Sequence, residues 1–158
     1  MENKIEQNKY LHKNKVHHIL AHSYSFYFLL FIIGVFLDLI FNVQFFESPV
    51  LLPVGFVLLV LASLLIFWAQ KSSHKLKIEN LSKETFCRGP YCYTRSPTHW
   101  GLFLLMLSFG FITNAFFVIV FTVVSFFITK FVFVKKQESI LEEKYGEAYK
   151  EYKKSVRL

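Results

Sequence analysis

The residues best suited to chemistry lie close together, between positions 89 and 101. Ser96-Pro97 predicts the start of a helix, because serine can cap free backbone N–H groups and proline fits the first helical position. Arg95 therefore lies beside unpaired N–H groups, and its guanidinium is suited to bind an anion or a carboxylate. The alternative is an interfacial arginine whose charged end only reaches out of a membrane.

A second candidate lies near the C-terminus, where the chain becomes highly charged. Apolar and aromatic residues recur there at helical spacing, which predicts an amphipathic helix with an aromatic stripe. Most charges on this helix are typical of a solvated face. Glu138 differs because it follows closely after the last apolar run, and we expect it to lie opposite Arg95. The stripe consists of Leu141, Tyr145, Ala148, Tyr149, Tyr152 and Val156.

Membrane helices are the elements that must hold these residues. Of the 158 residues, 54% are hydrophobic and 19% aromatic, which is too apolar for an ordinary soluble domain. The last long run without charge is sufficient for two short helices with a break at Thr113-Asn114. We predict an all-α integral membrane protein with one domain over residues 1–158. Its parts are an interfacial helix over 1–22, four transmembrane helices over 23–46, 49–70, 97–113 and 115–134, a cytoplasmic loop over 71–96 and an amphipathic cytoplasmic helix over 135–156.

The basic residues indicate the orientation. Of the 18 Lys and Arg, 17 lie before the first predicted span, between the second and third, or after the fourth, and Lys130 lies near the end of the fourth. Four spans place these blocks on one side, as the positive-inside rule requires, whereas three spans would separate the last block. Both termini are expected in the cytoplasm, at the inner membrane if the cell is bacterial. The net charge of +7 favours anionic membrane lipids as partners, and no nucleic-acid partner is expected.

Three further features of the sequence bear on function. Asp38 is an ionisable residue inside a predicted span, which makes it a functional candidate unless it only approaches the outer interface. Cys87 and Cys92 lie in the predicted cytoplasmic loop, where a reducing environment disfavours a structural disulfide, and their spacing is a poor zinc pattern. No metal site is expected, because the N-terminal histidines have no Cys or carboxylate ligand near them.

Two blocks of sequence carry a family resemblance. The first is Gly89-Pro90-Tyr91 followed by Arg95, Pro97 and Gly101, and the second is Gln137-Glu138-Ser139-Ile140-Leu141 followed by Tyr145-Gly146, Tyr149, Tyr152, Val156 and Arg157. Together they resemble the integral membrane methyltransferases of the isoprenylcysteine carboxyl methyltransferase and phospholipid N-methyltransferase group. The resemblance covers about residues 85–158, and two blocks at the expected separation are more specific than either alone.

The resemblance implies S-adenosylmethionine as cofactor, bound at the cytoplasmic membrane face. The implied reaction is methyl transfer to a lipophilic acceptor that carries a carboxylate or an amine. Arg95 and Glu138 are the implied catalytic residues, because the donor's carboxylate needs a cation and its ammonium needs an acceptor. The implied cofactor-binding residues are Tyr91, Arg95, Ser96, Pro97, His99, Gln137 and Glu138.

Three positions depart from the family pattern. Ser96 replaces a usual histidine, His99 replaces a usual tyrosine, and Gln137 replaces the first of two usual glutamates. His99 lies one helical turn beyond Ser96, so these two changes can compensate for each other. The alternative hypothesis is a non-enzymatic small membrane protein that serves as a binding or structural subunit. A transporter is disfavoured, because no paired broken helices are evident.

Overall fold

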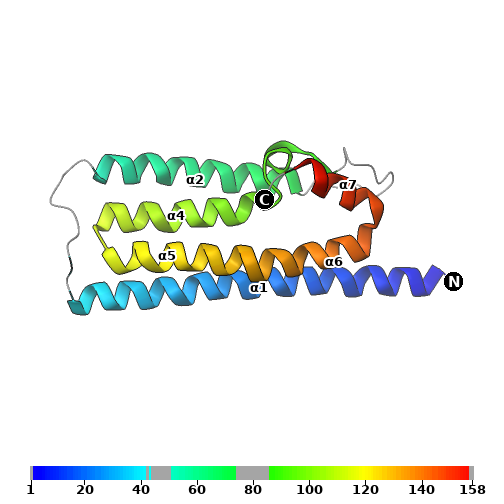
Figure 1. The fold of residues 1–158 in the computed structure, drawn as a ribbon, viewed down its shortest axis with the longest axis horizontal. Coiled ribbons are helices and arrows are strands. Elements are labelled where there is room, and N and C mark those ends of the chain that lie inside the picture. Colours follow the sequence, from blue (N-terminus) through cyan, green and yellow to red (C-terminus); the bar gives the residue numbers. More distant parts are fainter. Residues whose placement is uncertain (1, 42, 44–50, 74–85, 157–158) are drawn as a thin grey trace.

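The computed structural model describes residues 2–41, 43, 51–73 and 86–156, with side chains from residue 18 onward. All regular structure in these ranges is helical, which confirms the all-α prediction. The main helices, α1 (Glu2–Phe41), α2 (Leu51–Ser73), α4 (Pro97–Thr113) and α5 (Phe116–Ile128), form an elongated bundle (Figure 1). The turn η1 (Gly89–Cys92) precedes α4, and η2 (Thr129–Val134), α6 (Lys135–Tyr145) and α7 (Glu147–Ser155) follow α5.

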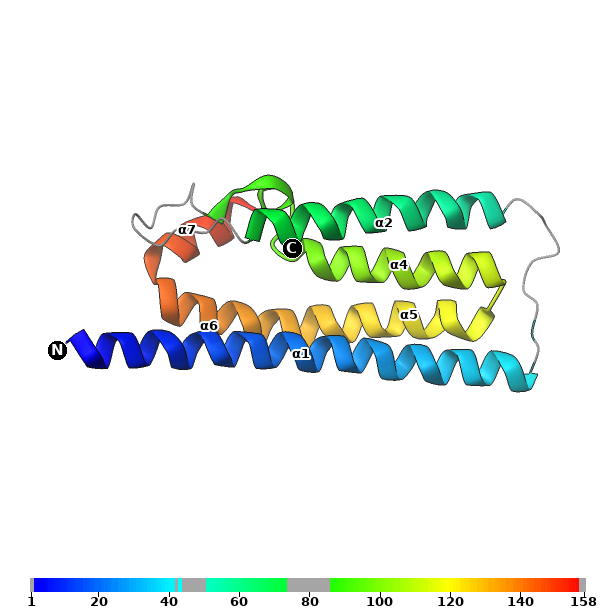
Figure 2. The same cartoon turned by 180° about the vertical axis from the view of Figure 1, so that it is seen from behind.

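The helices pack in the spatial order α2, α4, α5, α1, as the two opposite views show (Figures 1 and 2). Glycines lie where helices come closest. A Cβ atom on Gly55 would lie 3.0 Å from the carbonyl oxygen of Ser108, and one on Gly34 would lie 3.1 Å from Cα of Val118. Within a membrane, small residues at such crossings let the helix backbones approach and gain van der Waals contact.

Three apolar stretches of the described helices are long enough to cross a membrane, namely His18–Phe41, Leu51–Ser72 and Phe116–Tyr145. α4 is apolar too, but its 17 residues extend only about 25 Å, against a hydrocarbon core of about 30 Å. Large apolar side chains such as those of Phe28, Leu39 and Phe67 are mostly exposed on the outer surface of the bundle. Such a surface is suited to lipid contact.

The turn predicted at Thr113-Asn114 is confirmed. Asn114 adopts a left-handed conformation, with φ of 53°, and ends α4. Asp38 lies next to the start of α5. Its carboxylate accepts hydrogen bonds from the backbone N–H groups of Phe117 (3.0 Å) and Val118 (2.9 Å). These N–H groups have no partner within their own helix, so Asp38 acts as a cap supplied by a neighbouring helix.

Helix boundaries differ from the prediction near both ends of the chain. α1 is continuous from Glu2, so no break separates the interfacial helix from the first span, and the predicted end of that span lies largely outside the described residues. The predicted loop is shorter, because α2 continues to Ser73; its central residues, 74–85, lie outside the described ranges.

The predicted helix over 135–156 is also corrected. α5, η2 and α6 form one continuous rod over residues 116–145, so no break occurs at position 135. The break falls at Gly146 instead, where φ of 59° with ψ of −134° is readily adopted only by glycine. This turn directs α7 back over the end of the bundle, towards η1 and the end of α2 (Figure 1).

Candidate functional site

Arg95 and Glu138 meet at the end of the bundle where α7 folds back. Arg95 lies just before α4 and Glu138 lies in the first turn of α6, and their Nη1 and Oε1 atoms are 2.9 Å apart. Only 9% of the Arg95 side chain and 6% of the Glu138 side chain are exposed. The other carboxylate oxygen of Glu138 lies 3.2 Å from Nζ of Lys153, which also pairs with Glu142 at 2.5 Å. The predicted proximity of Arg95 and Glu138 is thus confirmed.

This ion pair leaves hydrogen-bonding capacity unused. Although the two charges are close, Nε and Nη1 of Arg95 and Oε1 of Glu138 do not meet hydrogen-bond geometry with any described residue. Buried polar atoms in folded proteins are nearly always hydrogen-bonded, and leaving one unsatisfied costs about 1–3 kcal/mol. A buried donor set beside a buried acceptor is therefore suited to a ligand that carries both a carboxylate and an ammonium.

Aromatic rings form one wall beside the pair. The ring of Phe86 lies 5.1 Å from that of Tyr145, 5.5 Å from that of Tyr149 and 5.7 Å from that of Tyr152, measured between centroids. The Tyr152 hydroxyl donates a 2.6 Å hydrogen bond to the carbonyl of Tyr91, which ties α7 to η1. The aromatic stripe predicted for the C-terminal helix thus faces this site.

The tyrosines of this wall remain protonated at neutral pH. Burial raises the pKa of Tyr91 to about 12, with a smaller contribution from nearby Tyr24. Burial also raises the pKa of Tyr149 and of Tyr152 well above the usual range. The second largest contribution to the raised pKa of Tyr149 comes from the Glu138 carboxylate. The second largest contribution to the raised pKa of Tyr152 comes from Tyr91. The site therefore presents neutral aromatic faces and hydroxyl groups beside one buried ion pair.

A cavity of about 140 Å³ opens between these groups. It is smaller than the roughly 300–1,000 Å³ typical of small-molecule sites, so it encloses one end of a cofactor-sized ligand. Its lining brings α2, η1, the start of α4, α6 and α7 together. The lining residues are Ser72, Phe86, Arg88, Tyr91, Arg95, Gln137, Leu141, Tyr145, Tyr149 and Tyr152.

The turn that carries Tyr91 depends on Gly89. Its φ of 55° favours glycine, and a Cβ atom there would collide with Oγ of Ser72 and lie 3.0 Å from Nε1 of Trp68. The turn is also closed by a disulfide between Cys87 and Cys92, whose Cα atoms are 4.4 Å apart. The expectation of no disulfide was therefore wrong. It rested on the compartment, whereas the compact turn brings the two cysteines together.

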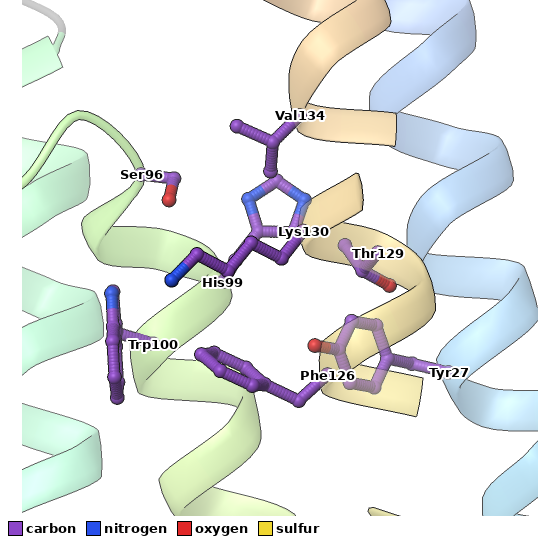
Figure 3. A pocket seen from close by; sticks show the side chains of 8 residues that line it. All are labelled: Tyr27, Ser96, His99, Trp100, Phe126, Thr129, Lys130 and Val134. Atoms are coloured by element: carbon purple, nitrogen blue, oxygen red, sulfur yellow. The ribbon is translucent and has the colours of Figure 1, made fainter. Parts of the chain in front are cut away.

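Ser96, Pro97 and His99 do not join this cavity. Ser96 occupies the N-cap position of α4, but its hydroxyl makes no cap hydrogen bond, so the predicted capping role was wrong. Pro97 is fully buried at the first helical position. His99 is buried and points towards α1, where its Nε2 lies 3.1 Å from Oγ of Ser23. Ser96 and His99 line a separate, smaller cavity (Figure 3).

The sequence missed several contributors to the site. Phe86, Ser72 and Lys153 had no signal of their own, because one phenylalanine among twenty and single polar residues form no pattern. Asp38 is excluded from the site by position: it caps α5 at the opposite end of the bundle, where the α4–α5 turn lies (Figure 1). Its place in a predicted span was correct, but its contacts are those of a structural cap.

Comparison with known proteins places these features in a family. No curated protein and no solved structure matches the chain. The sequence profile of the phospholipid methyltransferase family matches residues 50–148, which extend from the start of α2 into α7. The match includes Tyr91, Arg95 and Glu138, and it covers more than half of the chain. The chain therefore belongs to the phospholipid methyltransferase family, whose reaction class is methyl transfer.

Proposed function

We propose that this protein transfers a methyl group from S-adenosylmethionine to a membrane lipid, and that the cavity beside Arg95 and Glu138 holds the methyl donor. The observation that carries the proposal is the buried Arg95–Glu138 pair with its unused hydrogen-bonding atoms. When bound, the donor supplies an activated methyl group on a sulfonium, so the protein has mainly to bind and orient the reactants.

The residues of the cavity fit the donor's functional groups. Arg95 is suited to its carboxylate, because its Nε has no hydrogen-bond partner among the described residues, and Glu138 is suited to its ammonium. Phe86, Tyr145 and Tyr149 offer apolar faces for the adenine ring or for the positively charged sulfonium. Tyr91 and Gln137 lie in the same lining, whereas Ser96, Pro97 and His99 do not line this cavity.

The acceptor enters from the lipid side. An apolar groove of about 590 Å³ runs between α2 and α4 and is lined mainly by leucines, with Trp68 and Lys71 towards the site. The next residue, Ser72, already lines the donor cavity. An acyl chain in this groove would place a headgroup beside the donor. A lipid amine fits the family's phospholipid substrates better than a carboxylate does.

We further propose that α4 completes a set of four spans, with the donor cavity and both termini at the cytoplasmic face. α4 is antiparallel to α2 and α5 and packs against both, so a membrane that contains these two surrounds α4 as well. Cysteine accessibility tests this orientation. When an impermeant maleimide is added outside intact cells, cysteines introduced at exposed positions of α7 should react only after the membrane has been permeabilised.

Transfer of radiolabel tests the reaction itself. Membranes that contain the protein should transfer a tritiated methyl group from S-adenosylmethionine to an extractable lipid, and membranes with Arg95→Ala should not. Absence of both donor binding and lipid labelling would instead favour the alternative, a non-enzymatic subunit. Ser96, His99 and Gln137, which depart from the family pattern, are the reason for that alternative. Labelling that persists unchanged in Arg95→Ala would contradict the proposed site.

A further inference from the structure

A second cavity lies close to the Arg95–Glu138 pair. His99 follows Arg95 by four residues, and Val134 precedes Glu138 by four, and both His99 and Val134 line this cavity (Figure 3). Four residues correspond to about 5–6 Å along the rod that carries Val134 and Glu138, whereas Arg95 precedes the first residue of α4. The cavity has a volume of about 10 Å³, close to the minimum for a single water molecule or one oxygen atom.

Three buried side chains of this cavity have polar atoms without a partner. Tyr27 Oη, His99 Nδ1 and Thr129 Oγ1 make no hydrogen bond within the described part of the chain. The three residues are 0%, 3% and 1% exposed. Tyr27 and Thr129 are close neighbours that interact electrostatically, but neither hydroxyl has a partner of hydrogen-bond geometry among the described residues. Figure 3 shows the Tyr27 hydroxyl directed inward, opposite Ser96 and Trp100.

The charge around this cavity is positive. Lys130 is half-buried in its lining, and the lining contains no Asp or Glu. Across the described ranges, no carboxylate pairs with Lys130. Lys130 and Thr129 lie in η2, a π-helical segment, and such wide turns often occur at functional sites. A half-buried Lys130 ammonium needs a negative partner to offset its loss of hydration.

The neutral groups can all act as donors to such a partner. If the Ser23 hydroxyl donates to His99 Nε2, which lies 3.1 Å away, the imidazole hydrogen resides on Nδ1. His99 Nδ1, Tyr27 and Thr129 then each offer one hydrogen to the same small space. Three buried donors and one ammonium, without a carboxylate, match a single anionic oxygen.

We propose that this cavity binds one anionic oxygen of a lipid phosphate. The inference rests on the proposed function in one respect: the lipid bound here is the methyl acceptor. Its phosphate is held in the cavity lined by Ser96, the residue that follows Arg95 of the donor cavity. The two cavities contain different residues, so phosphate recognition and donor recognition fail in different variants.

Lipid binding to the purified protein in dodecyl maltoside tests the proposal. The probes are dioleoyl phosphatidylglycerol, dioleoylglycerol as a neutral control, oleate as a carboxylate and inorganic phosphate. Phosphatidylglycerol should bind more tightly than dioleoylglycerol and oleate. Lys130→Met and Tyr27→Phe should each weaken phosphatidylglycerol binding by roughly ten-fold. Lys136→Met, which removes an exposed cation from the same rod, is the matched control and should leave it unchanged.

S-adenosylmethionine affinity is measured on the same samples and should stay within about two-fold of wild type in all three variants. If inorganic phosphate binds as tightly as phosphatidylglycerol, the cavity still binds an anionic oxygen, but the oxygen belongs to free phosphate instead of a lipid. Equal binding of phosphatidylglycerol and dioleoylglycerol would show that the cavity holds water only and would overturn the proposal. Unchanged lipid affinity in both Lys130→Met and Tyr27→Phe would overturn it as well, even where donor binding is intact.

Discussion

Arg95 Nη1 lies 2.9 Å from Glu138 Oε1, and this contact joins the entrance of α4 to the first turn of α6. A buried ion pair of this kind adds little net stability, because the cost of removing both charges from water offsets their attraction. Removing one partner is costly, however, since the other charge stays buried. The pair is therefore better explained by what its unused atoms bind than by what it adds to the fold.

Tyr152→Phe removes the hydrogen bond that ties α7 to η1. The lost hydroxyl leaves the Tyr91 carbonyl without its 2.6 Å donor, so the free energy of unfolding should fall by about 1–2 kcal/mol. Binding of S-adenosylmethionine should weaken, because Tyr91 and Tyr152 line the same cavity. Thermal unfolding in detergent measures the change. Tyr93→Phe, at a position that is 78% exposed, is the control and should change stability by less than about 0.5 kcal/mol.

Gly89→Ala and Gly146→Ala form a matched pair. Both glycines have positive φ, so alanine strains the backbone at either position, by about 1–3 kcal/mol. Only Gly89 is also enclosed, by Ser72 and Trp68, whereas nothing lies within 4 Å of a Cβ atom on Gly146. Donor affinity should therefore fall much further in Gly89→Ala. Equal losses in isothermal titration would show that the packing of η1 against α2 is unimportant.

Asp38→Ala should destabilise the bundle without affecting the site. Two backbone N–H groups at the start of α5 lose their acceptor, which costs about 1–3 kcal/mol. Asp38→Asn should lose less, because its amide oxygen can still accept. Affinity for S-adenosylmethionine should stay within about two-fold of wild type in the folded protein. A large loss of affinity with normal thermal stability would restore Asp38 as a functional residue.

High pH should weaken the site through Tyr91. Its pKa is raised from 10.0 to about 12, so the folded state favours the neutral phenol. The stabilisation is fully present below pH 10 and is lost as the pH rises from about 10 to 12, by at most about 3 kcal/mol. Denaturant unfolding at pH 8 and pH 11 measures this loss. Tyr91→Phe cannot titrate, so its stability should fall less over the same interval; an equal fall would exclude Tyr91 as the cause.

Much of this architecture could be predicted because hydrophobic runs and basic blocks are strong signals. The bounds of α4, from Pro97 to Thr113, agree with the prediction, since a proline begins the helix and a turn at Asn114 ends it. The pairing of Arg95 with Glu138 could be expected because each lies at the polar end of an apolar run.

Other features depend on contacts that no local pattern shows. Gly146 lies between two residues of the predicted stripe, Tyr145 and Ala148, yet its backbone divides the C-terminal helix. His99 lies one turn from Arg95 in sequence, but its ring faces α1 and Ser23, which no spacing could indicate. The disulfide between Cys87 and Cys92 depends on the compact turn between them.

Binding of S-adenosylmethionine to the detergent-purified protein tests the central claim most directly. The variants are Glu138→Gln, the double variant Arg95→Met/Glu138→Leu and the control Glu147→Gln, which alters an exposed 2.8 Å ion pair with Lys150. Replacing both buried charges by apolar groups should preserve thermal stability, because neither charge is left alone.

We predict saturable binding to wild type and Glu147→Gln, and no measurable binding to the stable double variant. Glu138→Gln should bind at least about ten-fold more weakly, which corresponds to one lost charge-assisted hydrogen bond. Wild-type affinity in the double variant would contradict the assignment of this cavity to the methyl donor.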